Sequence, residues 1–280
     1  MEVWAKRCGS APGTLLAGPG AVDTIFEQAI NIRMHGGMCL SLVDSGIDLA
    51  PNRIVLPEGM VSRLPVRPGD HVRVEGKTLY HREFSIKFAP GAPRKCCPSL
   101  PSENSVRVIM KSLALGRGAC LCFFIQDAGD AIEQKVAGLA LRLIKDNAAA
   151  AELVGLGHGF TPAGDDVLVG YLALAHGLGW LNESWHRHIV EKALRESTAL
   201  SATAIYFAGL GYVQEYLENV LASLGQPLLL ERACRVLIER VGKSSGSDML
   251  LGVLVACCRY LYRGDMPNAQ ESSHQAQSVL

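Results

Sequence analysis

The sequence predicts an α+β protein, in which a β-rich N-terminal domain resembling a small barrel or sandwich precedes a mainly helical domain. Short alternating strands separated by turns fill the first hundred residues, and apolar residues later recur every three or four positions. A proline-rich stretch separates the two patterns. We therefore expect a β-rich domain with its linker at residues 1–103, a helical domain with the candidate site at 104–265, and a polar, disordered tail at 266–280.

The N-terminal strands are predicted from short apolar runs bounded by turn residues. Residues 29–32 and 39–43 flank the turn His35-Gly-Gly37 and predict a hairpin. Further strands are predicted at 53–56, 71–75 and 84–88. Strands of this length and spacing are typical of a barrel or a sandwich. Residues 90–104 contain four prolines and predict a linker without regular structure.

The helices are predicted from apolar periodicity and from helix-starting residues. Residues 166–179 are almost wholly apolar and predict a buried helix. Pro227 suits the first turn of another helix, and a break is expected near residues 197–201. The predicted helices cover residues 130–145, 166–179, 185–198, 202–224, 228–241 and 248–263.

The composition limits the partners and the compartment. The 280 residues are 49% hydrophobic and 19% charged with zero net charge, so no basic face for nucleic acid or for a membrane surface is expected. The longest apolar run, 167–179, is too short to span a membrane, and the first residues lack the apolar core of a secretory signal. Nine cysteines without regular spacing predict free thiols in the cytoplasm.

One motif occurs twice in the predicted helical domain. Gly164-Asp-Asp-Val-Leu-Val-Gly170 aligns with Gly246-Ser-Asp-Met-Leu-Leu-Gly252, and each copy follows a loop containing glycine and hydroxyl residues. Each copy also opens an apolar helix. Because glycine lets backbones approach closely, the two helices are expected to pack directly on each other.

The two helix starts are candidates for binding an anion. The first N–H groups of a helix lack internal partners, and the helix dipole adds partial positive charge there. Two such starts that met in one pocket would bind a phosphate or a carboxylate. Hydroxyls on a nearby helical face, Thr198 and Ser201, either pack between helices or form a polar wall of that pocket. The candidate anion-binding residues are Gly157, Gly159, Thr161, Gly164, Thr198, Ser201, Ser244, Ser245, Gly246 and Asp248.

Acidic residues and one histidine in the first loop are the candidate catalytic residues. Asp165 and Asp166 would repel a phosphate unless a cation or hydrogen bonds intervened, so both are also candidate Mg²⁺ ligands. Alternatively, Asp165 and Asp248 simply cap their helices. His158 lies between two glycines, where it is either a general acid–base group or a hydrogen-bonding loop residue.

These residues also carry a resemblance to a known family. Three segments, Ala29-Ile-Asn-Ile32, Gly157-x-Gly-x-Thr-Pro-x-x-Asp-Asp166 and Ser244-Ser-Gly-x-Asp-x-Leu-Leu-Gly252, resemble the AllH subunit of oxamate carbamoyltransferase. The order and spacing agree from about residue 29 to about residue 259. The resemblance implies a subunit that acts together with other carbamoyltransferase subunits in purine-derived nitrogen catabolism.

The implied reaction converts oxalurate and phosphate to oxamate and carbamoyl phosphate, or the reverse. Its participants are small anions, which agrees with anion binding at the paired helix starts. On this hypothesis Thr161, Ser244, Ser245 and the loop glycines bind the anion. Asp165 and Asp166 orient the amide nucleophile or hold Mg²⁺.

Two other functions remain open from the sequence. The aspartate pair could form the centre of a metal-dependent hydrolase or phosphatase. The chain could also be a non-catalytic subunit that binds a ligand or supports assembly. Only the first of these predicts activity from the isolated chain that a chelator abolishes.

Overall fold

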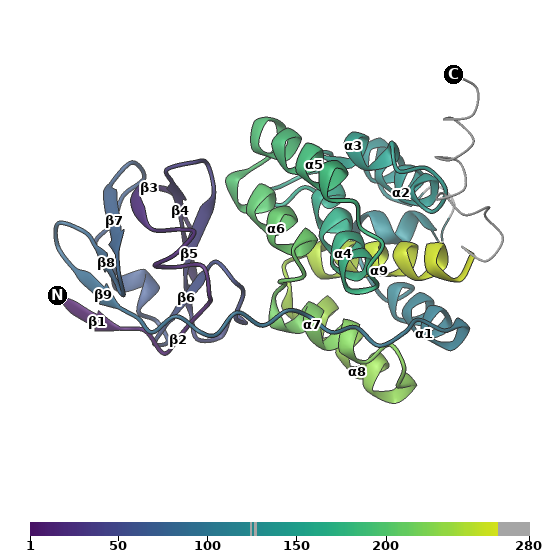
Figure 1. Ribbon diagram of the computed structural model, residues 1–280, viewed down its shortest axis with the longest axis horizontal. Helices are drawn as coiled ribbons and strands as arrows, with labels where there is room; N and C mark the ends of the chain where they lie inside the picture. The colour runs from purple at the N-terminus through teal and green to yellow at the C-terminus, as the bar shows by residue number, and fades with distance from the viewer. Residues whose placement is uncertain (124, 126–127, 263–280) are drawn as a thin grey trace, which may run out of the picture.

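The computed structural model describes residues 1–123, 125 and 128–262. A sheet formed by the N-terminal part of the chain lies beside a group of helices formed by the rest (Figure 1). The protein is therefore α+β, as predicted. The predicted polar tail at 266–280 lies outside the described residues. None of the described helices combines the length and the apolarity that crossing a bilayer requires.

The described strands form one curled sheet. The sheet order is β1-β9-β8-β7-β3-β4-β5-β6-β2, so β1 and β2 lie at opposite edges although only Ala5 and Lys6 separate them. The Ala5 N–H donates to the Lys87 carbonyl, and the Lys6 N–H donates to the Val55 carbonyl. The N-terminal segment is thus hydrogen-bonded to both edges of the sheet, and the sheet curls into a half-barrel. The strands are β1 (Glu2–Trp4), β2 (Arg7–Cys8), β3 (Gly18–Ile25), β4 (Ala29–Met34), β5 (Cys39–Asp44), β6 (Arg53–Leu56), β7 (His71–Glu75), β8 (Thr78–Tyr80) and β9 (Ser85–Lys87).

Alternating side chains build the core inside the half-barrel. In β7 the buried residues Val72 and Val74 alternate with exposed polar ones, which is the pattern that a sheet with one covered face requires. The hairpin of β4 and β5 has the predicted location, with Ile32 opposite Leu40. Phe207, which comes from a helix, completes the same apolar cluster.

The segment between the sheet and the first helix has no regular structure, as its prolines predict. It nevertheless packs along the helices, because the Cys96 N–H donates to Gly211 and the Ser99 N–H donates to Leu221. Helix α1 then begins after Ser102, whose side chain accepts from the Ser105 N–H in a capping box.

The helical part differs from the prediction in three places. The expected single helix over 202–224 is wrong, because the chain leaves the helix at 210–214, where Gly211 has φ +83°. Helices α1 and α3 were not predicted. The helices are α1 (Glu103–Leu113), α2 (Ala131–Leu143), α3 (Ala149–Leu153), α4 (Ala163–Gly177), α5 (Glu183–Glu196), α6 (Ala199–Gly209), α7 (Glu215–Ala222), α8 (Pro227–Arg240) and α9 (Ser245–Tyr262), with 3₁₀ turns at Val61–Arg63 and Gly118–Phe123.

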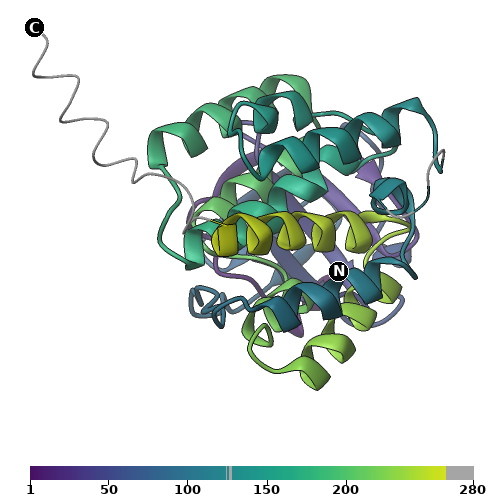
Figure 2. The same cartoon turned by 90° about the vertical axis from the view of Figure 1, so that its right-hand side faces the viewer.

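Helices α4 and α9 form the centre of the helical part. Helix α9, yellow in Figure 2, crosses the middle with helices on both sides. A Cβ added at Gly170 would lie 1.9 Å from the Met249 carbonyl oxygen, and one at Gly252 would lie 2.0 Å from that of Val167. Because Val167 and Met249 are equivalent in the repeated motif, the contact is reciprocal. The two helices pack backbone to backbone, as the glycine spacing predicts.

Candidate functional site

A cavity of about 210 Å³ lies between the sheet and the helices. On the sheet side its wall is residues 50–53, which lead into β6. On the helical side the wall includes the starts of α4 and α9 and one face of α6. Five of the residues predicted for the site line this cavity together: Thr161, Asp165, Asp166, Ser201 and Ser245.

The two helix starts meet at this cavity. The Thr161 and Ser245 hydroxyl oxygens lie 2.9 Å apart, although 84 residues separate them in the chain. Glycines allow each start to sit against the preceding helix. A Cβ at Gly164 would lie 2.1 Å from the Leu153 carbonyl oxygen, and one at Gly246 would lie 2.1 Å from that of Leu237. The motif glycines therefore serve close packing, which brings the hydroxyl residues together.

The helix-start amides are partly occupied within the protein. The Gly164 N–H donates to the Leu156 carbonyl at 2.8 Å, and the Gly246 N–H donates to the Val241 carbonyl at 2.9 Å. These two N–H groups are not free for a ligand. Polar recognition at this end of the cavity therefore depends on the side chains of Thr161, Ser245 and Asp166 more than on the motif amides.

Asp165 is buried and joins three segments of the chain. Its carboxylate accepts hydrogen bonds from the Gly155 N–H at 2.8 Å and from the Ser197 hydroxyl. Burial raises its pKa, against the lowering effect of these donors. The alternative that Asp165 caps α4 is wrong, because the N-cap is Pro162 and no side chain caps there. Asp165 fixes the loop before α4 against the start of α6.

Asp166 is more poorly hydrogen-bonded than Asp165. It is 3% exposed, and its Oδ2 atom has no hydrogen bond among the described residues. Burial raises its pKa well above the usual value, and Asp248 and Asp165 add repulsion, while the Ser245 and Thr161 hydroxyls oppose the shift. This shift favours the protonated carboxyl group, which can donate a hydrogen bond to an anion. Repulsion of a phosphate, expected from the sequence, is thereby reduced.

Asp248 occupies the equivalent position of the second motif but does not line the cavity. It is 0% exposed, and neither carboxyl oxygen completes a hydrogen bond of normal geometry within the described residues. Burial raises its pKa to about 7, although the nearby Ser244 hydroxyl and the Cys120 N–H lower it. Asp248 lies inside the first turn of α9. It acts on the cavity through its repulsion of Asp166.

The aspartate pair has no cluster of further metal ligands around it within the described residues. Both oxygens of Asp165 already accept hydrogen bonds from the protein. The described part of the chain contains no group of three or more histidine, cysteine, aspartate or glutamate side chains placed to hold a metal ion. Asp165 therefore offers Mg²⁺ no unpaired carboxylate oxygen, and the metal role of Asp165 and Asp166 stays a prediction.

Several predicted residues lie away from the cavity lining. His158 is exposed, and its Nε2 lies 2.6 Å from the Asp130 carboxylate at the start of α2. Thr198 caps α6 by accepting from the Ser201 N–H at 3.1 Å. The loop glycines Gly157 and Gly159 have φ of +139° and +86°, which shapes the turn before α4. The other predicted residues outside the lining are Gly164, Ser244, Gly246 and Asp248.

Sequence reasoning missed the sheet side of the cavity. Asn52 and Arg53 enter the wall from the start of β6, and Gln214 enters from the turn between α6 and α7. Arg53 was predicted only as the first residue of a strand. Nothing in the local sequence marks these residues, because their role depends on the sheet packing against the helices.

The cavity lies at the junction of two regions that match a single family. A sequence family described as the AllH family N-terminal domain matches residues 8–94. A family described as oxamate carbamoyltransferase subunit AllH matches residues 153–257, which include both copies of the repeated motif. Searches of curated proteins and of solved structures found no match. The two family matches together cover most of the chain, from the half-barrel to the central pair of helices, and the protein therefore belongs to the AllH family.

Proposed function

We propose that the protein is a subunit of a carbamoyltransferase complex that binds a small anionic substrate in the cavity between the sheet and the helices. The supporting observation is the contact between Thr161 and Ser245 at 2.9 Å. It joins the two motif helices at the wall of the cavity. The family match supplies the reaction class.

The proposed reaction moves a carbamoyl group between nitrogen and phosphate. The carbamoyl carbon of oxalurate leaves the oxamate nitrogen and joins a phosphate oxygen, and the nitrogen takes the proton that phosphate releases. The products are oxamate and carbamoyl phosphate, and the reverse reaction uses the same groups. This chemistry belongs to purine-derived nitrogen catabolism, which we place in the cytoplasm.

The cavity supplies suitable groups for such substrates. One hydroxyl of the Thr161–Ser245 pair donates to the other, which in turn donates to a phosphate oxygen. Asp166 in its protonated form donates a further hydrogen bond. Asp165 acts indirectly, by fixing the loop before α4 through Gly155 and Ser197. In this assignment the motif glycines position the hydroxyls instead of contacting the anion.

The proposal is tested by ligand-induced stabilisation of the full chain. Phosphate, carbamoyl phosphate or oxamate raises the melting temperature if it binds the native state only, because a ligand at a hundred times its Kd adds about 2.7 kcal/mol. Asp166→Ala abolishes the shift with phosphate and with carbamoyl phosphate, and it abolishes the activity of the assembled complex. Asp166→Asn retains part of the shift, because the amide still donates. Asp146→Ala, an exposed aspartate of the helical part, is the control.

Two results would contradict the proposal. One is an unchanged melting temperature of the wild-type chain with every anion. The other is phosphate-ester hydrolysis by the isolated chain that requires magnesium and is lost with a chelator. The second result would favour a metal-dependent hydrolase.

A further inference from the structure

The positive charge in the cavity wall comes from the sheet side. Among the described residues that line the cavity, Arg53 is the only lysine or arginine. It stands at the first position of β6, whereas the Thr161 and Ser245 hydroxyls come from the helical part. The cavity therefore has a cationic side chain from one region and hydroxyl groups from the other.

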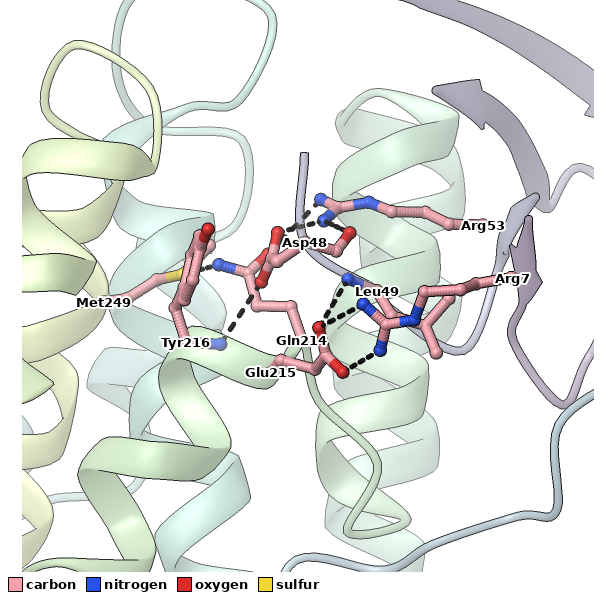
Figure 3. A network of polar contacts seen from close by, with 8 residues as sticks. All are labelled: Arg7, Asp48, Leu49, Arg53, Gln214, Glu215, Tyr216 and Met249. Carbon is pink, nitrogen blue, oxygen red and sulfur yellow. Dashed lines mark hydrogen bonds and ion pairs between the residues drawn. The ribbon is translucent and has the colours of Figure 1, made fainter. Parts of the chain in front are cut away.

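Arg53 is held in place by a buried partner. Its Nη1 atom donates to the Asp48 carboxylate at 2.5 Å and to the Asp48 carbonyl at 2.9 Å (Figure 3). The Asp48 carboxylate also accepts from the Tyr216 N–H at 3.2 Å, across the border to the helices. These contacts use Nη1 and leave donors on Nη2 and Nε, since a guanidinium has five N–H groups. The position of Arg53 is thus fixed while part of its hydrogen-bonding capacity is unused.

Gln214, beside Arg53, has two weak partners. Its Oε1 accepts from Arg53 Nη2 at 3.3 Å, and its Nε2 donates to the Met249 sulfur at 3.5 Å (Figure 3). The first distance exceeds the usual range, and a thioether is a weak acceptor. Gln214 is only 9% exposed. A buried amide with such partners gains from a ligand that offers stronger ones.

The acidic groups of the cavity wall repel a ligand carboxylate less than exposed aspartates would. Burial raises the pKa of both Asp165 and Asp166, which favours their neutral forms. The Asp48 carboxylate already pairs with the Arg53 guanidinium and accepts a hydrogen bond from the Tyr216 N–H at the start of α7.

We propose that Arg53 and Gln214 form the specificity pocket for the carboxylate and the adjacent amide of the substrate. Arg53 donates from Nη2 and Nε to the carboxylate, and Gln214 pairs with the neighbouring amide, which both donates and accepts. A carboxylate bonded directly to a carboxamide, as in oxamate, places these two groups side by side. This inference rests on the proposed function, because it places that substrate in the same cavity.

The pairing also divides the substrates between the two sides of the cavity. The carboxylate-amide end binds to residues beside the sheet, and phosphate binds to the Thr161 and Ser245 hydroxyls. The groups that exchange the carbamoyl unit then lie between the two sides.

The test measures oxamate and inorganic phosphate binding to the full chain by calorimetry. Arg53→Gln weakens oxamate binding about tenfold to a hundredfold, the range for a charge-assisted hydrogen bond, while phosphate binding changes less than threefold. The matched control is Arg7→Gln. Arg7 pairs with Glu215 in the same polar network of Figure 3 but does not line the cavity. Oxamate binding by this variant stays within twofold of wild type.

The possible outcomes separate this inference from the proposed function. Wild-type protein that binds neither anion removes the proposed function and the inference with it. Wild-type protein that binds oxamate while Arg53→Gln binds it equally well overturns the inference alone, as does an equal loss of both anions. If Arg53→Gln does not fold, Gln214→Glu decides. Its carboxylate would pair with Arg53 and weaken oxamate binding at least tenfold, and unchanged binding would overturn the inference.

Discussion

At the scale of single residues, the repeated motif places two carboxyl groups in the interior without full hydrogen bonding. Asp166 and Asp248 occupy equivalent motif positions, and each has at least one oxygen without a partner among the described residues. The sequence identified both as candidate site residues, because each follows a glycine at a helix start. Their protonation could not be predicted, since it depends on burial and on neighbours from distant segments.

Asp248 makes the stability of the protein depend on pH. Its pKa is raised to about 7 in the folded state, whereas an unfolded aspartate titrates near 3.9. Its contribution to the unfolding free energy is fully present below about pH 4, where the carboxyl group is protonated in both states. The contribution is lost as the pH rises to about 7, because the unfolded chain ionises freely while the folded state must ionise a buried acid. Asp248→Asn removes this loss. The variant therefore gains stability relative to wild type across this window, by at most on the order of 4 kcal/mol.

Urea denaturation at a series of pH values checks this expectation. The difference in unfolding free energy between Asp248→Asn and wild type rises from pH 4 to pH 7 and is level outside that window. Glu58→Gln, at an exposed position, serves as the control and shows no such rise. A difference that does not vary with pH would show that Asp248 titrates normally.

At the scale of elements, local patterns predicted the strands with clear alternation and the helices with clear starts. Strands β4 to β7 and β9, and helices α2, α4, α5, α8 and α9, appear near their predicted positions. Strand β3 was missed because Gly18, Pro19 and Gly20 do not favour a strand, and pairing on both sides with β4 and β7 stabilises it. Strands β1 and β2 are too short to show a pattern. The break after α6 was missed although Gly211, with φ +83°, is the kind of residue at which helices end.

Because α4 and α9 pack backbone to backbone, we expect one added methyl group at this contact to lower the stability of the protein strongly. Gly170→Ala and Gly252→Ala each place a Cβ about 2 Å from a carbonyl oxygen of the other helix, so the helices must separate. We expect a loss of about 3 kcal/mol or more in unfolding free energy, at or beyond the upper end for overpacking.

Gly138→Ala is the matched control for this prediction. Gly138 lies inside α2, and a Cβ there meets nothing within 4 Å. Alanine should stabilise this helix by about 0.5–1 kcal/mol, because it is the better helix former. Chemical denaturation of the three variants measures the difference. Equal effects at all three positions would mean that helix propensity, and not the α4–α9 contact, determines the outcome.

At the scale of the whole molecule, the cavity exists only because the sheet packs against the helices. The sequence predicted the contributions of α4, α6 and α9, since their residues belong to recognisable motifs. It did not predict Arg53 and Gln214, which meet 161 residues apart. A contact between residues so far apart produces no recognisable pattern in the sequence. A local motif can therefore predict one side of a cavity between sheet and helices, whereas the other side requires the fold.

We propose that residues 1–103 and 104–265 are two domains whose stabilities are coupled through Phe207. This side chain belongs to α6, is buried in the apolar cluster of the half-barrel and lines the cavity. Phe207→Ala should therefore lower the stability of the sheet although the change lies in a helix. Removing a buried phenylalanine typically costs about 3–5 kcal/mol.

Native-state hydrogen exchange locates that loss. In Phe207→Ala the amides of β4 and β5, which are central in the sheet, exchange faster, while those of α8, outside the Phe207 cluster, change little. Phe207→Leu fills most of the space and gives a smaller effect at the same amides. If exchange instead accelerates equally in the sheet and in α8, the chain unfolds as one cooperative unit and the two-domain proposal is wrong. If only helical amides respond, Phe207 does not stabilise the half-barrel, and other contacts hold the two regions together, such as the polar contacts of Arg7, Asp48 and Glu215.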